Sequence, residues 1–293
     1  MKLISVGMLL SVAAITGCSK DEENLVEPAN CEIAGDNYGI TNGNSLGAGN
    51  DLSATTVFVY TQQDDESGNI CTGTLIDNDK VLTAAHCVEK KGTTFVAFTN
   101  SMDCAAAAPS RTLRVVTDKV IHPNYRGSED RNKSAYDLAV LKFSGNSPEG
   151  FYSRDLPTAP VRFSAANDVV VTGYGRSKSY DSGGVGALRY KALPGSSLSR
   201  SYYSQFLQKT VDLTRHNILV LDQRNGGVCS GDSGGPLYIK TPDGGLSLAG
   251  ITSKGINPHS ADGDGDVCFG VALFAEVQPN LEWIRESMRR LSY

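Results

Sequence analysis

Short apolar or alternating runs follow one another along most of the chain from about Val57 onwards. Gly, Asn, Asp and Pro separate these runs, and β-branched residues are frequent inside them. Examples are TTVFVY, KVLTA, TTFVAF, LRVVTDKVI, DLAVLKF, DVVVTGYG, GPLYI and LSLAGITS. Runs of this kind, bounded by turn residues, are typical of a β-sandwich or β-barrel. The pattern therefore predicts an all-β fold built from many short strands.

Only the C-terminal end of the chain has a helical pattern. In the segment VQPNLEWIRESMRRL, apolar residues recur at helical spacing at Leu281, Ile284, Met288 and Leu291. Pro279 lies near the start of this segment, and arginines gather towards its end, where cations favour a helix. We therefore expect one terminal α-helix.

The first residues have the pattern of an export signal rather than of a folded element. Lys2 is followed by an apolar run from Leu3 to Ile15, which is too short to cross a bilayer as a helix. The residues ITGC, ending at Cys18, resemble a bacterial lipoprotein signal, which implies cleavage before Cys18 and lipidation of its thiol. We expect a lipoprotein-type signal peptide over 1–17, with an ordinary secretory signal and an incidental cysteine as the alternative.

The residues SKDEENLVEPAN that follow Cys18 are polar and acidic and contain proline, which fits a disordered tether. We expect a lipid-anchored linker and pro-segment over 18–39. Two or more acyl chains on Cys18 would hold the protein stably on a membrane. The protein is thus expected to be exported, either as a membrane-anchored lipoprotein on the periplasmic or cell-surface face or as a secreted protein.

Composition narrows the possible functions. The 293 residues are 40% hydrophobic and 20% charged, as in ordinary soluble globular proteins, and the formal net charge is -5. A dedicated nucleic-acid binder needs a basic face that neutralises phosphates. We therefore expect no nucleic acid among the partners.

The chain has seven cysteines, an odd number. If Cys18 carries the lipid, an even set remains, and an even set in an exported chain indicates disulfides. The set consists of Cys31, Cys71, Cys87, Cys104, Cys229 and Cys268. Metal binding is the competing interpretation, but the chain has no CxxC or HxxxH spacing. We expect neither a metal nor another cofactor.

One glycine-rich segment, GGVCSGDSGGPL, surrounds Ser233. Gly231, Gly234 and Gly235 permit positive φ angles and close backbone approach, which a pair of convergent N–H groups would require. Acyl transfer by a serine also needs a base for the hydroxyl proton and an acid that orients the base. Taken alone, such a segment is more often a turn.

Two further segments hold a candidate base and a candidate acid. His86 lies in LTAAHCV, just after an apolar strand, and Asp137 opens the apolar strand in YDLAVLKF. A buried carboxylate usually has a donor partner. Individually, a buried histidine is more often structural, and an acid at this position also fits the start of a strand.

In the order His86, Asp137, Ser233, these segments resemble the chymotrypsin–trypsin family of serine proteases. LTAAHC and GDSGGPL are the strongest motifs, and VIHPNY, VTGYG, GITSKG and LEWI match in order over most of the remaining chain. The resemblance implies two six-stranded antiparallel β-barrels with the site between them, closed by the C-terminal α-helix. It also implies a trypsin-like serine protease domain over 40–293.

The same resemblance implies a function for each residue. Ser233 would be the nucleophile, His86 the general base and then the general acid, and Asp137 the residue that orients the imidazole. The backbone N–H groups of Gly231 and Ser233 would form the oxyanion hole, and Ser253 would support the aspartate. The implied activity is hydrolysis of protein or peptide substrates through an acyl-enzyme. A catalytically inactive, protease-like binding or adhesion module is the alternative.

Disulfides are implied beside the histidine and beside the specificity pocket, namely Cys71–Cys87 and Cys229–Cys268. Cys31 and Cys104 then remain as an expected third pair, which would tie the pro-segment to the first barrel.

The resemblance places the specificity pocket around Gly227, Val228, Ser253, Gly255 and Gly270. Family members that cleave after Arg or Lys have an acid where this chain has Gly227. A buried cation would have no partner there, whereas an open apolar pocket suits large apolar side chains. We expect cleavage after Phe, Tyr, Leu or Met.

The rival hypothesis is basic specificity supplied by the acidic loop at Asp262, Asp264 and Asp266. These residues alternate like the start of a calcium loop, but the later Gly and Glu positions of an EF-hand hold Val267 and Leu273. We expect a solvated acidic loop rather than a metal site.

The segment YGITNGNS resembles the activation junction of the family's zymogens. Ile40 would be the new N-terminus after cleavage, and its amino group would pair with Asp232. A buried ion pair is costly unless both charges are present, so the oxyanion hole would be completed only after cleavage. Gly39 departs from the Arg or Lys that many zymogens have there, so an activating protease that accepts Tyr38–Gly39, or autolysis, is required. The alternative is a chain that is active uncut.

Overall fold

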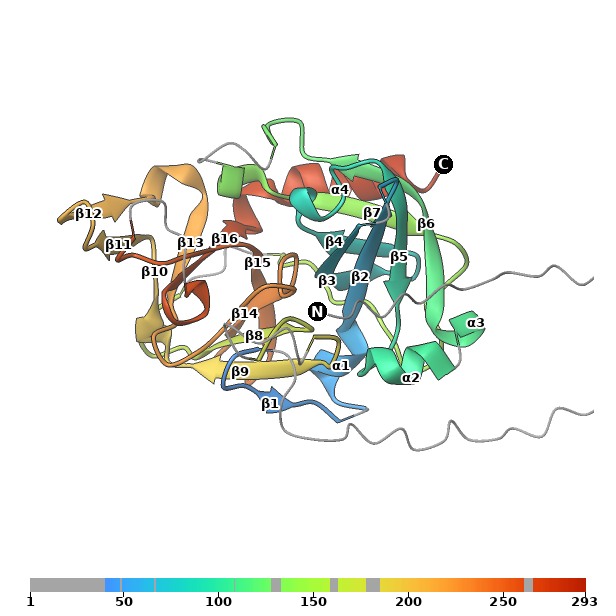
Figure 1. Ribbon diagram of the computed structural model, residues 1–293, viewed down its shortest axis with the longest axis horizontal. Coiled ribbons are helices and arrows are strands. Elements are labelled where there is room, and N and C mark those ends of the chain that lie inside the picture. The colour runs from blue at the N-terminus through green and yellow to red at the C-terminus, as the bar shows by residue number, and fades with distance from the viewer. Residues whose placement is uncertain are drawn as a thin grey trace, which may run out of the picture. The chain divides into compact units, whose positions relative to one another are not determined.

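The computed structural model describes residues 40–47, 49–65, 67–107, 109–127, 133–158, 163–177, 185–260 and 266–293. Two antiparallel β-structures fill most of this part of the chain, and a helix follows them at the C-terminal end (Figure 1). This mostly-β architecture confirms the fold class predicted from the sequence.

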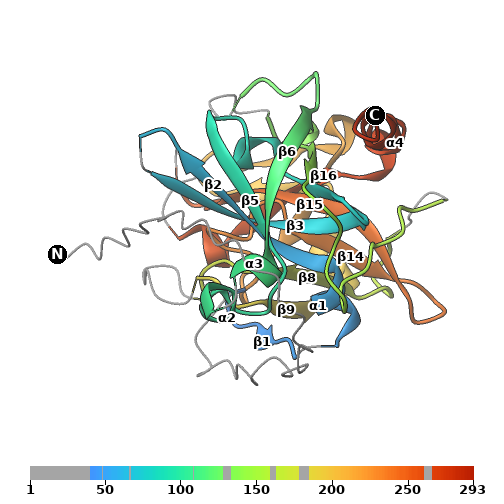
Figure 2. The same ribbon diagram turned by 90° about the vertical axis from the view of Figure 1, so that its right-hand side faces the viewer.

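The first β-structure is a closed six-stranded barrel. Its strands are β2 (Thr56–Gln63), β3 (Gly68–Asp77), β4 (Lys80–Thr83), β5 (Gly92–Ala97), β6 (Leu113–Ile121) and β7 (Ala139–Phe143). They pair antiparallel in the order β2-β3-β4-β7-β6-β5. Figure 2 looks onto this barrel, with β2, β5 and β6 in front.

The second β-structure is a curled sheet of eight strands. Its strands are β1 (Asn44–Ser45), β8 (Val169–Gly173), β9 (Arg189–Leu193), β10 (Leu198–Ser199), β13 (Ile218–Asp222), β14 (Pro236–Lys240), β15 (Leu246–Ile256) and β16 (Val271–Glu276). They pair antiparallel in the order β1-β9-β8-β14-β15-β16-β13-β10. Among the described residues the two edge strands do not pair with each other. The expected second barrel is therefore a curled half-barrel with short extra strands at its edges.

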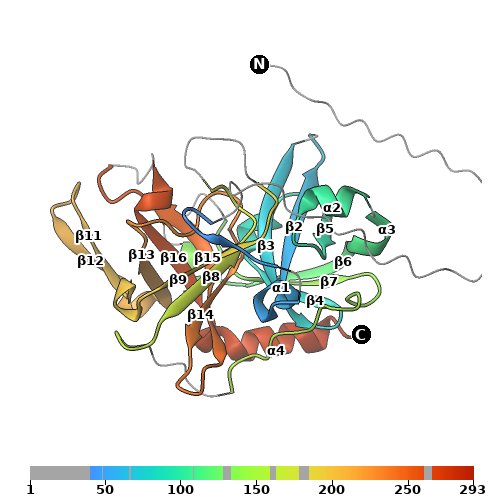
Figure 3. The same ribbon diagram turned by 90° about the horizontal axis from the view of Figure 1, so that it is seen from below.

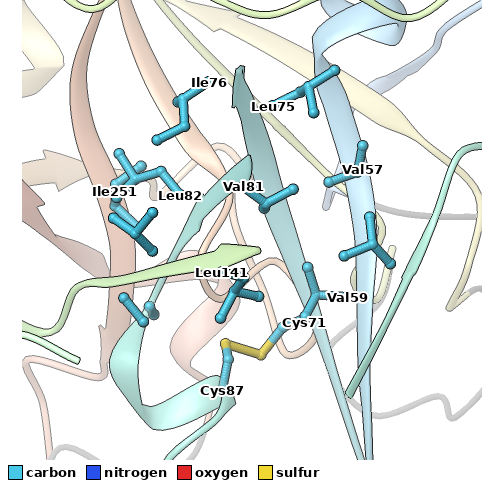
Figure 4. Packing of buried hydrophobic residues seen from close by; sticks show 14 of the residues in the cluster. Val57, Val59, Cys71, Leu75, Ile76, Val81, Leu82, Cys87, Leu141 and Ile251 are labelled. Carbon is cyan, nitrogen blue, oxygen red and sulfur yellow. A yellow bond between two sulfur atoms is a disulfide. The ribbon is translucent and has the colours of Figure 1, made fainter. Parts of the chain in front are cut away.

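One hydrophobic cluster continues from the barrel into the second sheet. Val170 of β8, Tyr238 of β14 and Ile251 of β15 belong to the same cluster as Leu82 and Leu141 of the barrel. Figure 4 shows Ile251, Leu82 and Leu141 among these side chains. Because protein cores are close-packed, a shared cluster holds the two halves in one arrangement.

The helical elements are short apart from the last one. They are α1 (Asp51–Thr55), α2 (Met102–Ala107), α3 (Pro109–Thr112), α4 (Leu281–Arg290), and the 3₁₀ turns η1 (Ala85–Cys87), η2 (Lys133–Tyr136), η3 (Gly195–Ser197), η4 (Thr214–His216), η5 (Val267–Phe269) and η6 (Gln278–Asn280). The pattern of apolar residues did not predict α1, α2 or α3. It did predict α4, whose Leu281 and Ile284 are buried in the shared cluster. Figure 3 shows α4 lying along one side of the two β-structures.

The structure contains the disulfides Cys71–Cys87 and Cys229–Cys268. The first joins β3 to η1 (Figure 4). Cys104 is also disulfide-bonded, and its expected partner Cys31 lies outside the described residues, as do the expected lipidation site Cys18 and the whole of 1–39. None of the described helices combines the length and the apolar character needed to cross a membrane.

A separate hairpin, formed by β11 (Ser201–Ser204) and β12 (Lys209–Asp212), projects from the second half of the molecule (Figure 1).

Candidate active site

His86 and Asp137 are brought together by two paired barrel strands. β4 pairs with β7, with Thr83 opposite Ala139. His86 follows β4 in η1 and Asp137 precedes β7, so both residues lie at the same end of this strand pair. The Nδ1 atom of His86 lies 2.7 Å from Oδ2 of Asp137, and the His86 backbone N–H donates to Oδ1 at 2.9 Å. These two contacts fix the orientation of the imidazole against the carboxylate.

Two serines continue the network around the buried Asp137 carboxylate. Ser253 Oγ donates to Oδ2 of Asp137 at 2.6 Å, and Ser134 Oγ lies 3.1 Å from Ser253 Oγ. Because the single Ser253 proton goes to the carboxylate, the Ser134 hydroxyl donates to Ser253. Burial alone would raise the pKa of Asp137, but His86 and the Ser253 hydrogen bond hold this pKa below its usual range. The ionised carboxylate directs the Nδ1–H of His86 towards itself and leaves Nε2 available as a base.

The Ser233 loop packs directly on the segment that leads to His86. The Thr72 backbone N–H of β3 donates to the Ser233 carbonyl at 2.7 Å. A Cβ atom on Gly234 would overlap Thr83 Oγ1 and the Thr72 carbonyl, so only glycine permits this approach. The Ser233 hydroxyl makes no hydrogen bond among the described residues, His86 included. Catalytic hydrogen bonds are often long or poorly aligned when no substrate is bound.

Two backbone N–H groups beside the Ser233 side chain are available to an anion. Within the described part of the chain, neither the Gly231 N–H nor the Ser233 N–H makes a hydrogen bond. The carbonyls of Ser230 and Asp232, on the other side of the same two peptides, each accept a backbone N–H at 2.9 Å. Since N–H and C=O point in opposite directions in a trans peptide, the held carbonyls fix the directions of the free N–H groups. Gly231 has a φ of 101°, which glycine adopts without strain.

The Asp232 side chain is fully buried between the Ser233 loop and Gly175. Its carboxylate accepts the backbone N–H groups of Gly175 and Cys229, each at 2.7 Å. Burial, only partly offset by these hydrogen bonds, raises the pKa of Asp232 from 3.8 to about 7. No Lys, Arg or His side chain of the described residues forms an ion pair with it.

The segment that begins at Ile40 packs against the residues that precede Asp232. Ile40 is fully buried in the core cluster of the second sheet, which also contains Val228. The Thr41 backbone N–H donates to the Gly227 carbonyl at 2.8 Å. The structure therefore places the expected activation segment beside the loop that carries its expected partner.

Comparison with known proteins agrees with this geometry. The family described as Trypsin matches residues 40–284, a range that contains His86, Asp137, Ser233 and the loop of Asp232. The chain belongs to the trypsin family.

Individual trypsin-family relatives are distant in sequence. Serine protease SP24D of Anopheles gambiae is 29% identical over 222 residues, which cover 75% of this chain and 72% of that protein. Kallikrein 1-related peptidase b1 of Mus musculus is 30% identical over 203 residues, which cover 64% of this chain and 71% of that protein. A solved structure described as "Structure of GrC" superposes with a TM-score of 0.62 at 21% identity, and the match covers 85% of this chain and 100% of that one. These relatives indicate a serine endopeptidase.

At the expected base of the specificity pocket, the space beside Gly227 is filled rather than open. A Cβ atom on Gly227 would lie 2.5 Å from Oε1 of Gln223, so the Gln223 side chain fills the space that the glycine leaves. Gln223 Nε2 donates to the carbonyls of Val228 at 2.9 Å and Val267 at 2.8 Å, and Oε1 accepts the Val228 N–H at 3.0 Å. At the wall, a Cβ atom on Gly255 would lie 2.8 Å from the Cβ atom of Val267. The base is therefore an uncharged, hydrogen-bonded amide.

The other expected pocket and loop residues occupy the η5 turn and its surroundings. Gly270 follows η5 in close contact with the Ile256 carbonyl. Asp266 accepts the Cys268 N–H at 3.2 Å and so caps η5. Asp262 and Asp264 lie outside the described residues.

Cys71, His86 and Cys87 are the one group of potential metal ligands that the described residues bring together. Both cysteines are oxidised in a disulfide, so they offer no thiolate to a metal.

Three polar residues near the site were not predicted from the sequence: Thr72, Ser134 and Gln223. Each is buried and hydrogen-bonded to a site residue or to its backbone. Thr72 lies within β3, Ser134 in η2 and Gln223 just after β13, and a lone Thr, Ser or Gln at such positions carries no sequence signal of its own.

Proposed function

We propose that the protein is a serine endopeptidase in which Ser233, His86 and Asp137 form the catalytic triad. The hydrogen bond of 2.7 Å between His86 Nδ1 and the buried Asp137 carboxylate carries this proposal, because it prepares Nε2 as a base beside the Ser233 loop. Membership of the trypsin family and the two free N–H groups at Gly231 and Ser233 support it.

In this mechanism Ser233 Oγ attacks the carbonyl carbon of the scissile peptide and its proton passes to His86 Nε2. The negative charge that develops on the carbonyl oxygen is stabilised by the N–H groups of Gly231 and Ser233. The imidazolium, stabilised by Asp137, then donates its proton to the leaving amine. A water molecule, deprotonated by His86, hydrolyses the acyl-enzyme and restores Ser233.

A fluorophosphonate probe tests the proposal, because it phosphonylates an activated serine. We expect labelling at Ser233 that His86→Ala abolishes. His216→Ala, at an exposed histidine outside the site, is the matched control and should label like the wild type. Absence of labelling in correctly folded, proteolytically activated protein would favour an inactive binding or adhesion module instead.

We propose further that the enzyme cleaves after uncharged residues of the Phe, Tyr, Leu or Met type. Both N–H groups of the Gln223 amide are used by the backbone of Val228 and Val267, and no carboxylate lies at the base among the described residues. A P1 arginine or lysine would therefore be buried without a partner. Faster hydrolysis of an Arg substrate than of matched Phe and Leu substrates would support the rival hypothesis of the acidic loop.

The position of the Gln223 side chain also leads to a prediction about redesign of the pocket. Gly227→Asp alone would place its side chain against Gln223 Oε1 and should not create cleavage after Arg. The double variant Gly227→Asp with Gln223→Ala has room for the new carboxylate. We expect it to hydrolyse an Arg substrate at least about tenfold faster than Gly227→Asp alone, since a buried cation needs its counter-charge.

We propose that the protein is made as a zymogen cleaved between Gly39 and Ile40. The ammonium group formed at Ile40 would pair with Asp232, which is buried without a cationic side chain among the described residues. N-terminal sequencing of the reduced, active enzyme should read Ile-Thr-Asn-Gly. Full activity in a chain still continuous through Gly39–Ile40 would refute the proposal.

We also propose export with lipid attachment at Cys18, the first residue of the linker and pro-segment 18–39. The two disulfides of the described residues are typical of proteins in oxidising compartments, which supports export. If Cys31 is the partner of Cys104, activation would leave the enzyme joined to its anchored pro-segment. Cys18→Ser should release the protein from the membrane fraction.

A further inference from the structure

We infer that Thr72 is a positioning residue for the oxyanion hole, and that its side-chain hydroxyl holds the Gly231–Asp232 peptide, which lies between the two peptides that carry the free N–H groups of Gly231 and Ser233. This inference rests on the proposed serine endopeptidase function. Thr72 lies in the middle of β3, in the first barrel, whereas the loop that it contacts belongs to the second half of the molecule.

Four consecutive carbonyls in the nucleophile loop are each held by one hydrogen bond. The Ser230 carbonyl accepts the backbone N–H of Arg176, which lies outside the loop. The Asp232 carbonyl accepts the backbone N–H of Gly235, which lies within it. The other two are held by Thr72 alone. Its backbone N–H donates to the Ser233 carbonyl at 2.7 Å, and its Oγ1 donates to the Gly231 carbonyl at 3.0 Å. The Thr72 hydroxyl is thus the one side-chain donor in this set.

The direction of the Thr72 hydroxyl is itself fixed. Its oxygen accepts the backbone N–H of Tyr174 at 3.2 Å, which leaves its proton for the Gly231 carbonyl. Tyr174 is fully buried, and its own hydroxyl lies 2.5 Å from the Thr99 carbonyl and 3.1 Å from the Thr56 carbonyl. The hydroxyl therefore links the nucleophile loop to a rigid part of the core.

Gly231 is the residue at which such a link matters most. With a φ of 101° and no Cβ atom, it has access to more backbone conformations than any other residue type. If the Gly231 carbonyl is released, the Gly231–Asp232 peptide keeps, among the described residues, only the hydrogen bond from its Asp232 N–H to the Cys229 carbonyl at 3.0 Å, so fewer contacts oppose its rotation. The two oxyanion-hole peptides on either side of it are then less firmly held. The oxyanion hole then spends less time in the arrangement that binds the transition state, whereas the substrate side chains still bind.

The test compares three variants with the activated wild type. Thr72→Val removes the hydroxyl at nearly constant volume, and Thr72→Ser keeps it. Thr74→Val is the matched control on the same strand, because Thr74 Oγ1 is buried and has no partner among the described residues. We measure kcat and KM on a peptide amide substrate, and affinity for a peptide boronate, which forms a tetrahedral adduct with the serine.

We expect Thr72→Val to lower kcat about 10- to 100-fold and boronate affinity by a similar factor. This loss should not exceed the loss that follows removal of a whole oxyanion-hole donor. KM should stay within about twofold, since ground-state binding is unchanged. Thr72→Ser and Thr74→Val should stay within about threefold of the wild type in kcat.

Wild-type kcat in Thr72→Val, or a loss in Thr72→Ser as large as that in Thr72→Val, would overturn the inference. If Thr72→Val does not fold, Thr72→Ala and Thr72→Ser, which differ by the hydroxyl alone, give the same comparison. A wild type that neither hydrolyses peptides nor reacts with a fluorophosphonate would overturn the proposed function and this inference with it. An active wild type with an unaffected Thr72→Val overturns the inference alone.

Discussion

Replacement of Asp232 by Asn in the uncut protein should remove a loss of stability that grows with pH. The Asp232 carboxyl is fully buried and has a pKa of about 7, against 3.8 when it is unperturbed. As long as Ile40 is joined to Gly39, the Ile40 nitrogen is an amide and brings no positive charge. Between these two pKa values the native chain keeps a proton that the unfolded chain has lost. The native state therefore becomes less stable as pH rises through this window.

The size of the effect follows from the two pKa values. Relative to a group that does not titrate, deprotonation of Asp232 in the unfolded chain lowers the free energy of unfolding by about 2 kcal/mol at pH 5. At pH 8 the free energy of unfolding is lower by about 4 kcal/mol. Asn does not titrate, so the stability difference between Asp232→Asn and the wild type should shift by about 2 to 3 kcal/mol in favour of the variant from pH 5 to pH 8. Any constant cost of placing an amide N–H₂ beside the N–H groups of Gly175 and Cys229 cancels in this comparison.

Urea unfolding at the two pH values measures the shift. Both proteins carry Ser233→Ala, which prevents autolysis and keeps the chain continuous through Gly39–Ile40. Parallel pH dependence of the variant and the wild type would show that the pKa of Asp232 is not raised in the uncut native chain, and would refute the reasoning. After cleavage by an added protease the sign should reverse, because the ammonium of Ile40 then stabilises the ionised carboxylate, and Asp232→Asn should be less stable than the protein with Asp232. With Ser233 retained, the cleaved Asp232→Asn variant should be inactive.

Two further substitutions test the geometry of the active site. Ser253→Ala removes the 2.6 Å hydrogen bond to the buried Asp137 and should lower kcat about tenfold, the effect of about 1.5 kcal/mol, with the circular dichroism spectrum unchanged. Gly231→Ala would force a side chain onto a φ of 101° and place its Cβ atom 2.7 Å from the Gly175 Cα atom. We expect it to lower kcat at least about 100-fold in steady-state assays, because the oxyanion-hole peptide must shift. Near-wild-type turnover in Gly231→Ala would mean that this N–H is not used.

The parts of the fold that the sequence predicted are those with a local cause. Alternating β-branched runs between turn residues indicated the strands, and the apolar face of Leu281 and Ile284 indicated α4. The short helices α1, α2 and α3 have too few residues for such a periodicity. The half-barrel form of the second sheet depends on which strands meet at its edges, and these pairings join residues far apart in the chain.

The residues of the candidate site also fall into those that the sequence predicted and those that it did not. His86, Asp137 and Ser233 lie in short segments with recognisable composition, and the structure brings His86 and Asp137 into hydrogen-bond contact. Gln223 and Thr72 have ordinary surroundings in the sequence. What they do depends on contacts with Gly227 and Gly231, which only the folded chain brings about.

The glycines connect these two kinds of residue. Gly227 leaves space that Gln223 fills, Gly175 leaves space beside the Asp232 carboxylate, and Gly234 allows the nucleophile loop to reach β3. Of these three, only Gly234 was predicted from the sequence to allow close backbone approach. Which side chain takes the space that a glycine leaves is decided by the packing of the two halves. Under the proposed function, we expect an uncharged amide and a charged carboxylate in the same space to select different substrates. Position in a motif therefore predicts where the chemistry would occur, whereas we expect the buried neighbours of the motif to set the substrate.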